Sequence, residues 1–103
     1  MNTTRRRRIE VLADEPLIPA ITRIAASAGI VHYTLLPVSG GAGVRGRWRD
    51  DQLSGATSKV MLLLVTSEEH ADAFVEQLAP MLETHHLLLM VSDVSVVRGH
   101  RFD

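Results

Sequence analysis

The chain has 103 residues, a formal net charge of −1 and no cysteine. This length predicts a single domain, residues 1–103, built around one hydrophobic core. The near-neutral charge argues against a polycation that binds nucleic acid, and the lack of cysteine excludes disulfides and thiol catalysis and favours the cytoplasm. No long apolar run follows the N-terminal arginines, Arg5–Arg8, so we expect neither a signal peptide nor a membrane-spanning segment.

The first third of the chain predicts a strand, a helix and a second strand. The apolar residues after the arginines indicate a strand from Arg5 to Leu12. Asp14 is expected to cap a helix that ends at Gly29. β-Branched and aromatic residues then predict a strand over residues 30–38, with Pro37 at its edge or end.

The second half repeats this order. The apolar run from Lys59 to Thr66 predicts a strand that is buried on both faces. Thr66 and Glu69 have the spacing of a capping box and are expected to open a second helix, which Pro80 should kink or shorten. Residues 87–97 predict the last strand. This β-α-β-loop-β-α-β order indicates an α+β, ferredoxin-like fold (βαββαβ) with an antiparallel four-stranded sheet and both helices on one face.

Two of the predicted strands are apolar on both sides, over residues 60–65 and 87–91. Because the two helices cover only one face of such a sheet, strands whose other face met water should alternate apolar and polar residues. We therefore expect the second face to pack on other subunits in a closed homo-oligomer.

A glycine- and arginine-rich segment, residues 39–58, separates the two halves and shows little periodicity. Four of the seven glycines lie within residues 40–46, and Arg45, Arg47 and Arg49 follow at alternating positions. Glycines let the backbone approach a ligand closely, and guanidinium groups match phosphate or carboxylate oxygens. The segment is therefore interpreted as a long mobile loop that binds an anion and is partly disordered without ligand, the alternative being a flexible solvated connector.

Several short motifs resemble the PII signal-transduction proteins. Tyr33-Thr34, the double glycine Gly40-Gly41, the nearby arginines and Gly99-His100-Arg101-Phe102 are similar to the PII-like branch that is associated with carboxysomes and bicarbonate transport. The resemblance covers nearly the whole chain. It implies a homotrimeric ferredoxin-like sensor that binds adenine nucleotides in clefts between subunits.

The resemblance also implies a set of binding residues. Backbone groups of a glycine loop would line the nucleotide, two arginines would hold its phosphates, a threonine would lie near the adenosine end, and the C-terminal segment would close the cleft. The implied nucleotide-binding residues are Thr34, Gly41, Gly43, Val44, Arg45, Arg47, Arg98, Gly99 and His100.

Two departures from the PII pattern refine this hypothesis. Residues 83–86 lack the glycine-rich, lysine-bearing segment that holds the terminal phosphate of ATP in PII proteins, which favours AMP or ADP over ATP. The large loop lacks a tyrosine, which argues against control by uridylylation. The resemblance further suggests bicarbonate as a co-ligand and a bicarbonate transporter or carboxysome component as the partner, with the loop regulating inorganic-carbon uptake or carboxysome function.

Other classes of function have weaker support in the sequence. Adjacent histidines, His85-His86, point to opposite sides of a strand and do not readily chelate one metal ion. Arg5–Arg8 could form a nucleic-acid arm, but the chain has only four aromatic residues, which favours ordinary surface or subunit-boundary charge. His70 is expected to be exposed, and His32 to lie on a strand surface or at an interface.

The sequence therefore predicts a sensor with no catalytic and no metal-binding residues, because no nucleophile with an adjacent base can be identified. The alternatives that remain are a PII-like module that senses a metal or a small anion and, with less support, an RNA-binding ferredoxin-like domain.

Overall fold

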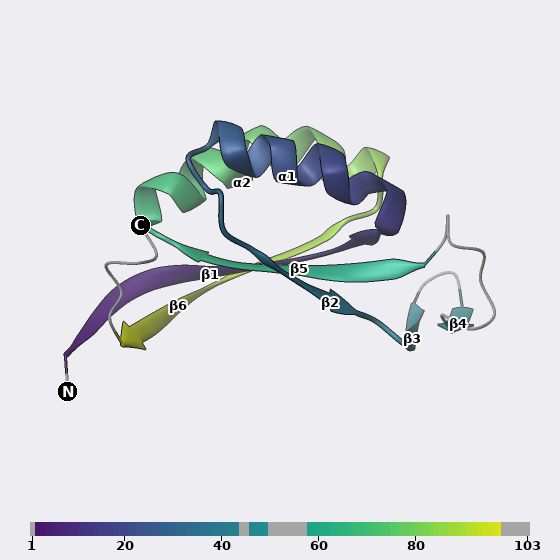
Figure 1. Ribbon diagram of the computed structural model, residues 1–103. Helices are drawn as coiled ribbons and strands as arrows, with labels where there is room; N and C mark the ends of the chain where they lie inside the picture. The colour runs from purple at the N-terminus through teal and green to yellow at the C-terminus, as the bar shows by residue number, and fades with distance from the viewer. Residues whose placement is uncertain (1, 44–45, 50–57, 98–103) are drawn as a thin grey trace.

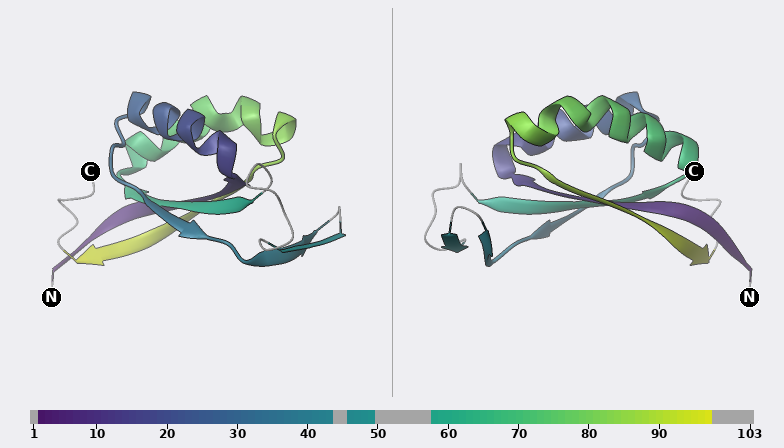
Figure 2. Two further views of the ribbon diagram at one scale, coloured as in Figure 1. Left: turned by 45° about the vertical axis from the view of Figure 1, so that its right-hand side comes forward. Right: turned by 180° about the vertical axis from the view of Figure 1, so that it is seen from behind.

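The computed structural model describes residues 2–43, 46–49 and 58–97. These residues form two layers, an antiparallel four-stranded sheet and a pair of helices that lie together on one of its faces (Figures 1 and 2). The elements in chain order are β1 (Thr3–Asp14), the 3₁₀ helix η1 (Glu15–Leu17), α1 (Ile18–Ser27), β2 (Thr34–Pro37), β3 (Gly40–Gly43), β4 (Gly46–Arg49), β5 (Lys59–Thr66), α2 (Glu68–Thr84) and β6 (Leu88–Val97). The strand order β2-β5-β1-β6 confirms the predicted ferredoxin-like α+β fold.

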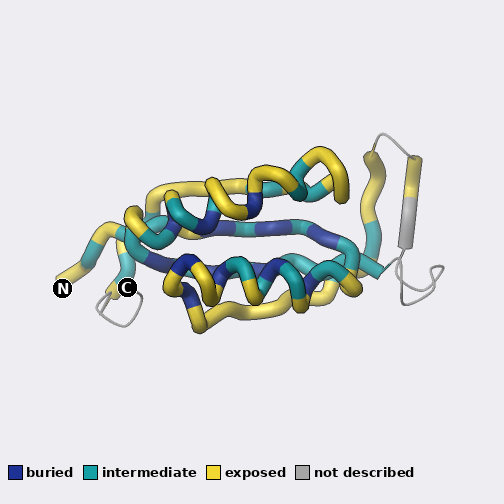
Figure 3. The backbone as a smooth tube through the Cα atoms, turned by 90° about the horizontal axis from the view of Figure 1, so that it is seen from above, coloured by how far each residue is buried: buried dark blue, intermediate teal, exposed yellow. Residues whose placement is uncertain are grey.

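The core lies between the two layers. Alternate residues of the central strands point toward the helices, and Figure 3 shows buried positions along these strands and on the inner sides of the helices. The largest of these side chains are fully buried and form one continuous cluster: Ile9, Val11, Ile21, Leu62, Leu64, Phe74 and Leu78. Burial of this cluster is what holds the helices on the sheet.

The start of the first helix differs from the prediction. Asp14 precedes η1, but its side chain makes no capping hydrogen bond, and α1 begins only at Ile18. The Asp14 carboxylate instead accepts a hydrogen bond from Lys59 Nζ at 2.8 Å. The long-range ion pair across β1 and β5 replaces the local cap.

The start of the second helix is also shifted, by one residue. Ser67, not Thr66, is the N-cap, and its Oγ accepts a hydrogen bond from the backbone N–H of His70 at 3.2 Å. Thr66 is the last residue of β5 and is only 2% exposed, on the same buried side of the strand as Leu62 and Leu64. The prediction of a Thr66–Glu69 capping box was therefore wrong, and α2 continues through Pro80 to Thr84.

Among the described residues, no helix is long and apolar enough to cross a membrane.

The second strand and the segment after it show the largest differences between the structure and the prediction from the sequence. β2 spans only Thr34–Pro37, and residues 31–33 before it are exposed and outside any strand. Pro37 ends β2, which is an edge strand, as predicted. The prediction that residues 39–58 lack regular structure is wrong for β3 and β4, which pair as a hairpin from Gly40↔Arg49 to Gly43↔Gly46. Gly46 has a φ of +96°, a conformation that glycine adopts without strain.

The sheet face opposite the helices is uncovered in one chain and is called the open face below. Cross-strand partners on this face include Leu36, Met61 and Leu12 in one row, and further apolar side chains are exposed at Leu88 and Met90. β5 alternates between buried and half-buried positions, so its predicted two-sided burial is not reached within a single chain.

Candidate functional site

The β3–β4 hairpin carries three of the predicted binding residues. Gly41 lies opposite Trp48, Ala42 opposite Arg47, and Gly43 opposite Gly46. Arg47 is exposed, and a Cβ added to Gly43 would meet no atom within 4 Å. The hairpin therefore presents open backbone and a guanidinium group side by side. Val44 and Arg45, the other two predicted residues here, lie outside the described residues.

Thr34 lines a cavity of about 150 Å³ at the edge of the sheet. Its lining comes from the start of β2 and from β5: His32, Tyr33, Thr34, Leu63, Leu64 and Val65. The β2–β5 ladder ends at Thr34↔Leu63, whereas β5 continues to Thr66. Beyond Leu63 the edge of β5 has no β2 residue opposite it, and an edge of this kind offers backbone N–H and C=O groups to a ligand.

Two of the residues that line this cavity were missed as site residues. His32 and Tyr33 are exposed, and Tyr33 is 45% exposed despite its aromatic ring. The sequence placed them inside a strand, where alternate side chains would have pointed to opposite faces. Because β2 begins only at Thr34, both instead contribute to the same cavity.

The hairpin and the end of β6 lie far apart in one chain. The molecule measures 44 × 29 × 21 Å, and Figure 1 shows the hairpin at one end of the sheet and the end of β6 at the other. The predicted residues Arg98, Gly99 and His100 follow Val97, the last residue of β6, and lie outside the described residues. A site that used both the hairpin and residues adjoining Val97 would need at least two protomers.

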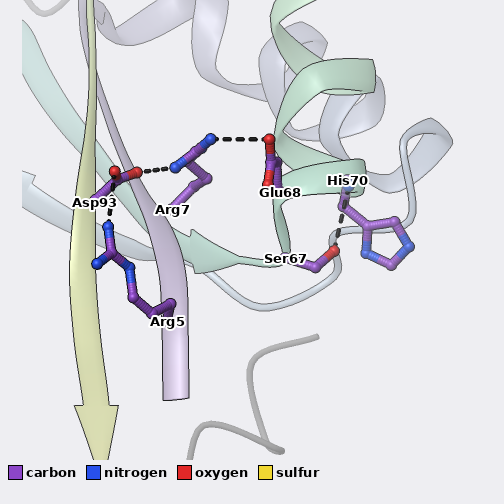
Figure 4. Close-up of polar contacts among 6 residues, drawn as sticks. All are labelled: Arg5, Arg7, Ser67, Glu68, His70 and Asp93. Carbon is purple, nitrogen blue, oxygen red and sulfur yellow. Dashed lines mark hydrogen bonds and ion pairs between the residues drawn. The ribbon is translucent and has the colours of Figure 1, made fainter. Parts of the chain in front are cut away.

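An arginine-rich cluster lies at the end of the sheet where β1 begins and β6 ends (Figure 4). Arg7 contacts Asp93 through Nη1, and its Nη2 lies 3.0 Å from Glu68 Oε1. Arg5 Nη2 lies 3.1 Å from the second oxygen of Asp93. The sequence favoured ordinary surface or subunit-boundary charge for these arginines, and it did not reveal their partners, which lie far away in the sequence on β6 and α2.

The histidines do not form a metal site in the described part of the chain. No group of three or more His, Cys, Asp or Glu side chains that could hold a metal ion occurs there. The prediction that His70 is exposed was wrong, because its Nδ1 is buried and has no hydrogen-bond partner among the described residues. Its ring lies against Gly29, where an added Cβ would come within 2.9 Å of Nε2.

The model of the family described as "Nitrogen regulatory protein P-II" matches residues 6–101. Among solved structures, CPII from Thiomonas intermedia K12, a PII-like protein bound to ADP, AMP and bicarbonate, is 20% identical, with 98% of this chain and 96% of that chain covered and a TM-score of 0.89. The same protein bound to ADP and bicarbonate gives 20% identity, coverage of 99% and 98%, and a TM-score of 0.85.

A PII-like signaling protein from Thermus thermophilus is 22% identical over 100% of both chains, with a TM-score of 0.81. No curated protein matches the chain by sequence. At these identities, the likeness to the solved structures shows the fold.

Proposed function

The chain belongs to the nitrogen regulatory P-II family, and we propose that it is a PII-like sensor of the branch associated with carboxysomes and bicarbonate transport. In this proposal it is a cytoplasmic homotrimer that binds AMP or ADP in preference to ATP in the clefts between protomers, with bicarbonate as a second ligand. It catalyses no reaction. Residues 39–58, the large loop of a single domain that spans residues 1–103, carry the signal to a bicarbonate transporter or a carboxysome component.

The observation that carries the proposal is the cavity beside Thr34. A purine ring is flat, apolar on its faces and rich in hydrogen-bonding groups on its edge. The cavity combines apolar side chains, Leu63 and Val65 among them, with the strand edge of β5 and the hydroxyl of Thr34. This combination is suited to an adenine base, because backbone groups can bond the edge of the base while side chains cover its faces.

The separation of the hairpin from the end of β6 supports binding between protomers. The resemblance assigns phosphate contacts to Arg45 and Arg47 in the large loop and cleft closure to residues 98–100. One chain presents Arg47 at one end of the sheet and Val97 at the other. A nucleotide that contacts both segments therefore bridges two protomers, and the apolar open face supplies the surface on which protomers associate.

The preference for AMP or ADP is supported by the short connection between α2 and β6. Only residues 85–87 separate Thr84 from Leu88, and none of the three is lysine, arginine or glycine. Such a connection offers no glycine-rich backbone and no ammonium group to a terminal phosphate. We therefore expect the third phosphate of ATP to gain little from this part of the protein.

Bicarbonate is included because of the solved structures and the chemistry of arginine. The two CPII structures hold bicarbonate together with ADP. A guanidinium group matches a planar carboxylate-like anion through two parallel hydrogen bonds.

The two ends of the large loop are fixed to the body of the protein. On one side Pro37 is paired with Val60 in the β2–β5 ladder. On the other, the backbone N–H of Glu15 donates to the carbonyl oxygen of Ser58 at 2.7 Å, and Lys59 pairs with Asp14. In the proposed mechanism, a bound phosphate selects one conformation of the segment between these anchors, and this conformation is the signal that the partner reads.

Isothermal titration calorimetry with AMP, ADP and ATP tests the proposal. We expect the double variant R45A/R47A to lose about 100-fold or more in affinity for AMP and ADP, because it removes charge-assisted hydrogen bonds to phosphate. Thr34→Val keeps the shape of the side chain but removes the hydroxyl, and we expect a loss of about tenfold. ADP affinity should rise when bicarbonate is added at constant ionic strength.

The matched control is Arg23→Ala, which removes an exposed arginine from α1, outside both candidate regions. It should leave nucleotide affinity unchanged. Equal affinities of R45A/R47A and the wild type would contradict the phosphate role of the loop, and tighter binding of ATP than of ADP would contradict the nucleotide preference.

A further inference from the structure

Tyr33 is an exposed aromatic residue that does not belong to the hydrophobic core. It lies in residues 31–33, which precede β2 and belong to no strand, and it is 45% exposed. Phe74, by contrast, is 0% exposed and is part of the core. Tyr33 is also the single tyrosine of the sequence, and it lines the cavity at the edge of β5. Packing of the core therefore does not explain the aromatic ring at this position.

The size of this cavity limits which part of a ligand can enter it. Its volume is about 150 Å³. Pockets that hold whole drug-sized ligands measure about 300–1,000 Å³, whereas an apolar cavity of about 150 Å³ admits a benzene ring. The cavity of one chain therefore has room for a flat ring, and the sugar and phosphate of a nucleotide would lie outside it.

The edge of β5 supplies polar groups to the same cavity. β1 pairs with every residue of β5, but the β2–β5 ladder ends at Leu63. Successive residues of a strand direct their N–H and C=O groups to opposite sides, so one of Leu64 and Val65 directs both groups away from β1 at this edge. A hydrogen-bond donor and an acceptor thus lie next to each other where a flat ring would enter.

We propose that Tyr33 is the base-stacking residue of the nucleotide site, and this inference rests on the proposed function. The ring of Tyr33 covers one face of a purine base, while the edge of the base meets β5. Aromatic side chains stack on nucleic acid bases because both present flat π systems whose contact removes apolar surface from water. Tyr33 thereby sets the specificity of the site for a ligand with a base, and for a purine, whose two fused rings offer more stacking surface than a pyrimidine.

Isothermal titration calorimetry with AMP and CMP tests this role. We expect Tyr33→Leu, which keeps an apolar side chain but removes the ring, to bind AMP less tightly by about tenfold or more, because stacking on the base is lost. Tyr33→Phe keeps the ring and should bind AMP like the wild type. The preference of the wild type for AMP over CMP should shrink in Tyr33→Leu.

Val31→Ala is the matched control. Val31 belongs to the same segment outside any strand and is 67% exposed, but it does not line the cavity. This variant truncates an exposed apolar side chain two residues from Tyr33, and it should leave the affinity for AMP unchanged. An equal loss in Val31→Ala and Tyr33→Leu would contradict a specific role of the ring.

NMR spectroscopy gives a second measurement that does not depend on a substitution. Because Tyr33 is the only tyrosine of the chain, labelling tyrosine with carbon-13 makes its ring signals directly assignable. AMP should shift these signals to lower frequency, as a stacked aromatic base does, and should give nuclear Overhauser effects between the ring and the purine protons. Ribose 5-phosphate carries the sugar and the phosphate but no base, so it should leave the signals in place.

The outcomes distinguish failure of this inference from failure of the proposed function. AMP that binds equally well to Tyr33→Leu, or that binds to the wild type without shifting the Tyr33 signals, would overturn the stacking role but not the nucleotide site. Equal losses in Tyr33→Phe and Tyr33→Leu would also overturn it, since phenylalanine retains the ring. A wild type that does not bind AMP would overturn both. If light scattering shows that Tyr33→Leu changes the oligomeric state, the signals of the wild-type ring decide the question.

Discussion

At the scale of single residues, Gly29 has two reasons to be glycine. Its φ is +92°, in the left-handed region, and a Cβ at this position would lie 2.9 Å from His70 Nε2. Gly29→Ala should therefore lower the free energy of unfolding by about 1–3 kcal/mol, through backbone strain and displacement of the His70 ring. Urea denaturation at fixed protein concentration measures this change.

Gly43→Ala is the matched control for this substitution. A Cβ at Gly43 meets no atom within 4 Å, and its φ is not positive, so unfolding should be nearly unaffected. In the background of Gly29→Ala, His70→Ala removes the contact with the ring but leaves the φ strain. The loss of unfolding free energy caused by Gly29→Ala should therefore be smaller in a His70→Ala background than in the wild type, and the loss that remains reports the φ strain. Full stability of Gly29→Ala itself would contradict the conformation of this turn.

At the scale of elements, α2 depends on the cap that Ser67 provides. The Ser67 Oγ accepts a hydrogen bond from one of the first N–H groups of the helix, which have no partner within it. Ser67→Ala should destabilise the protein by about 1 kcal/mol, whereas Ser67→Asp keeps an acceptor at the cap and should cost much less. Thermal unfolding of the two variants against the wild type tests this, and equal destabilisation by both would argue against the cap.

The sequence predicts elements well where a signal is local. The Lys59–Thr66 strand has the predicted bounds because its apolar run begins after a lysine and ends at polar residues. The helix starts were less accurate, since Asp14 pairs with Lys59 across the sheet and Thr66 remains in the strand. In both cases the local motif predicted a helix cap, but a tertiary contact or a strand pairing engages that residue instead.

The candidate sites were harder to predict for the same reason. Composition marks the glycine- and arginine-rich segment, and the resemblance to PII proteins implies Gly41, Gly43 and Arg47 within it; all three lie in one hairpin. The partnership of Arg7 with Asp93 and Glu68 joins residues that are more than 60 positions apart. Only the strand register and the position of α2 bring them together, and neither can be read from the sequence around Arg7.

At the scale of the whole molecule, a single chain leaves an apolar face uncovered and holds two segments of the proposed binding site far apart. The open face leaves apolar side chains such as Leu36 at 43% exposure and Leu88 at 49% exposure. The hairpin and the end of β6 stand at opposite ends of a molecule that is 44 Å long. Association of protomers through the open face would bury these apolar side chains. It would also allow the end of β6 in one protomer to lie near the hairpin of the next. Both features thus favour association of protomers, as the proposed trimer requires.

Met61→Glu tests this assembly directly. Met61 lies on the open face between Leu12 and Leu36 and is half-buried in one chain, so a glutamate there can be solvated in a monomer. In the trimer it would place a carboxylate without a partner in an apolar interface, which is strongly unfavourable. The wild type should have the mass of three chains in size-exclusion chromatography with light scattering, and the variant should dissociate. Gln77→Glu adds the same charge to an exposed position of α2 and should remain trimeric, so a trimeric Met61→Glu variant would exclude the open face as the interface.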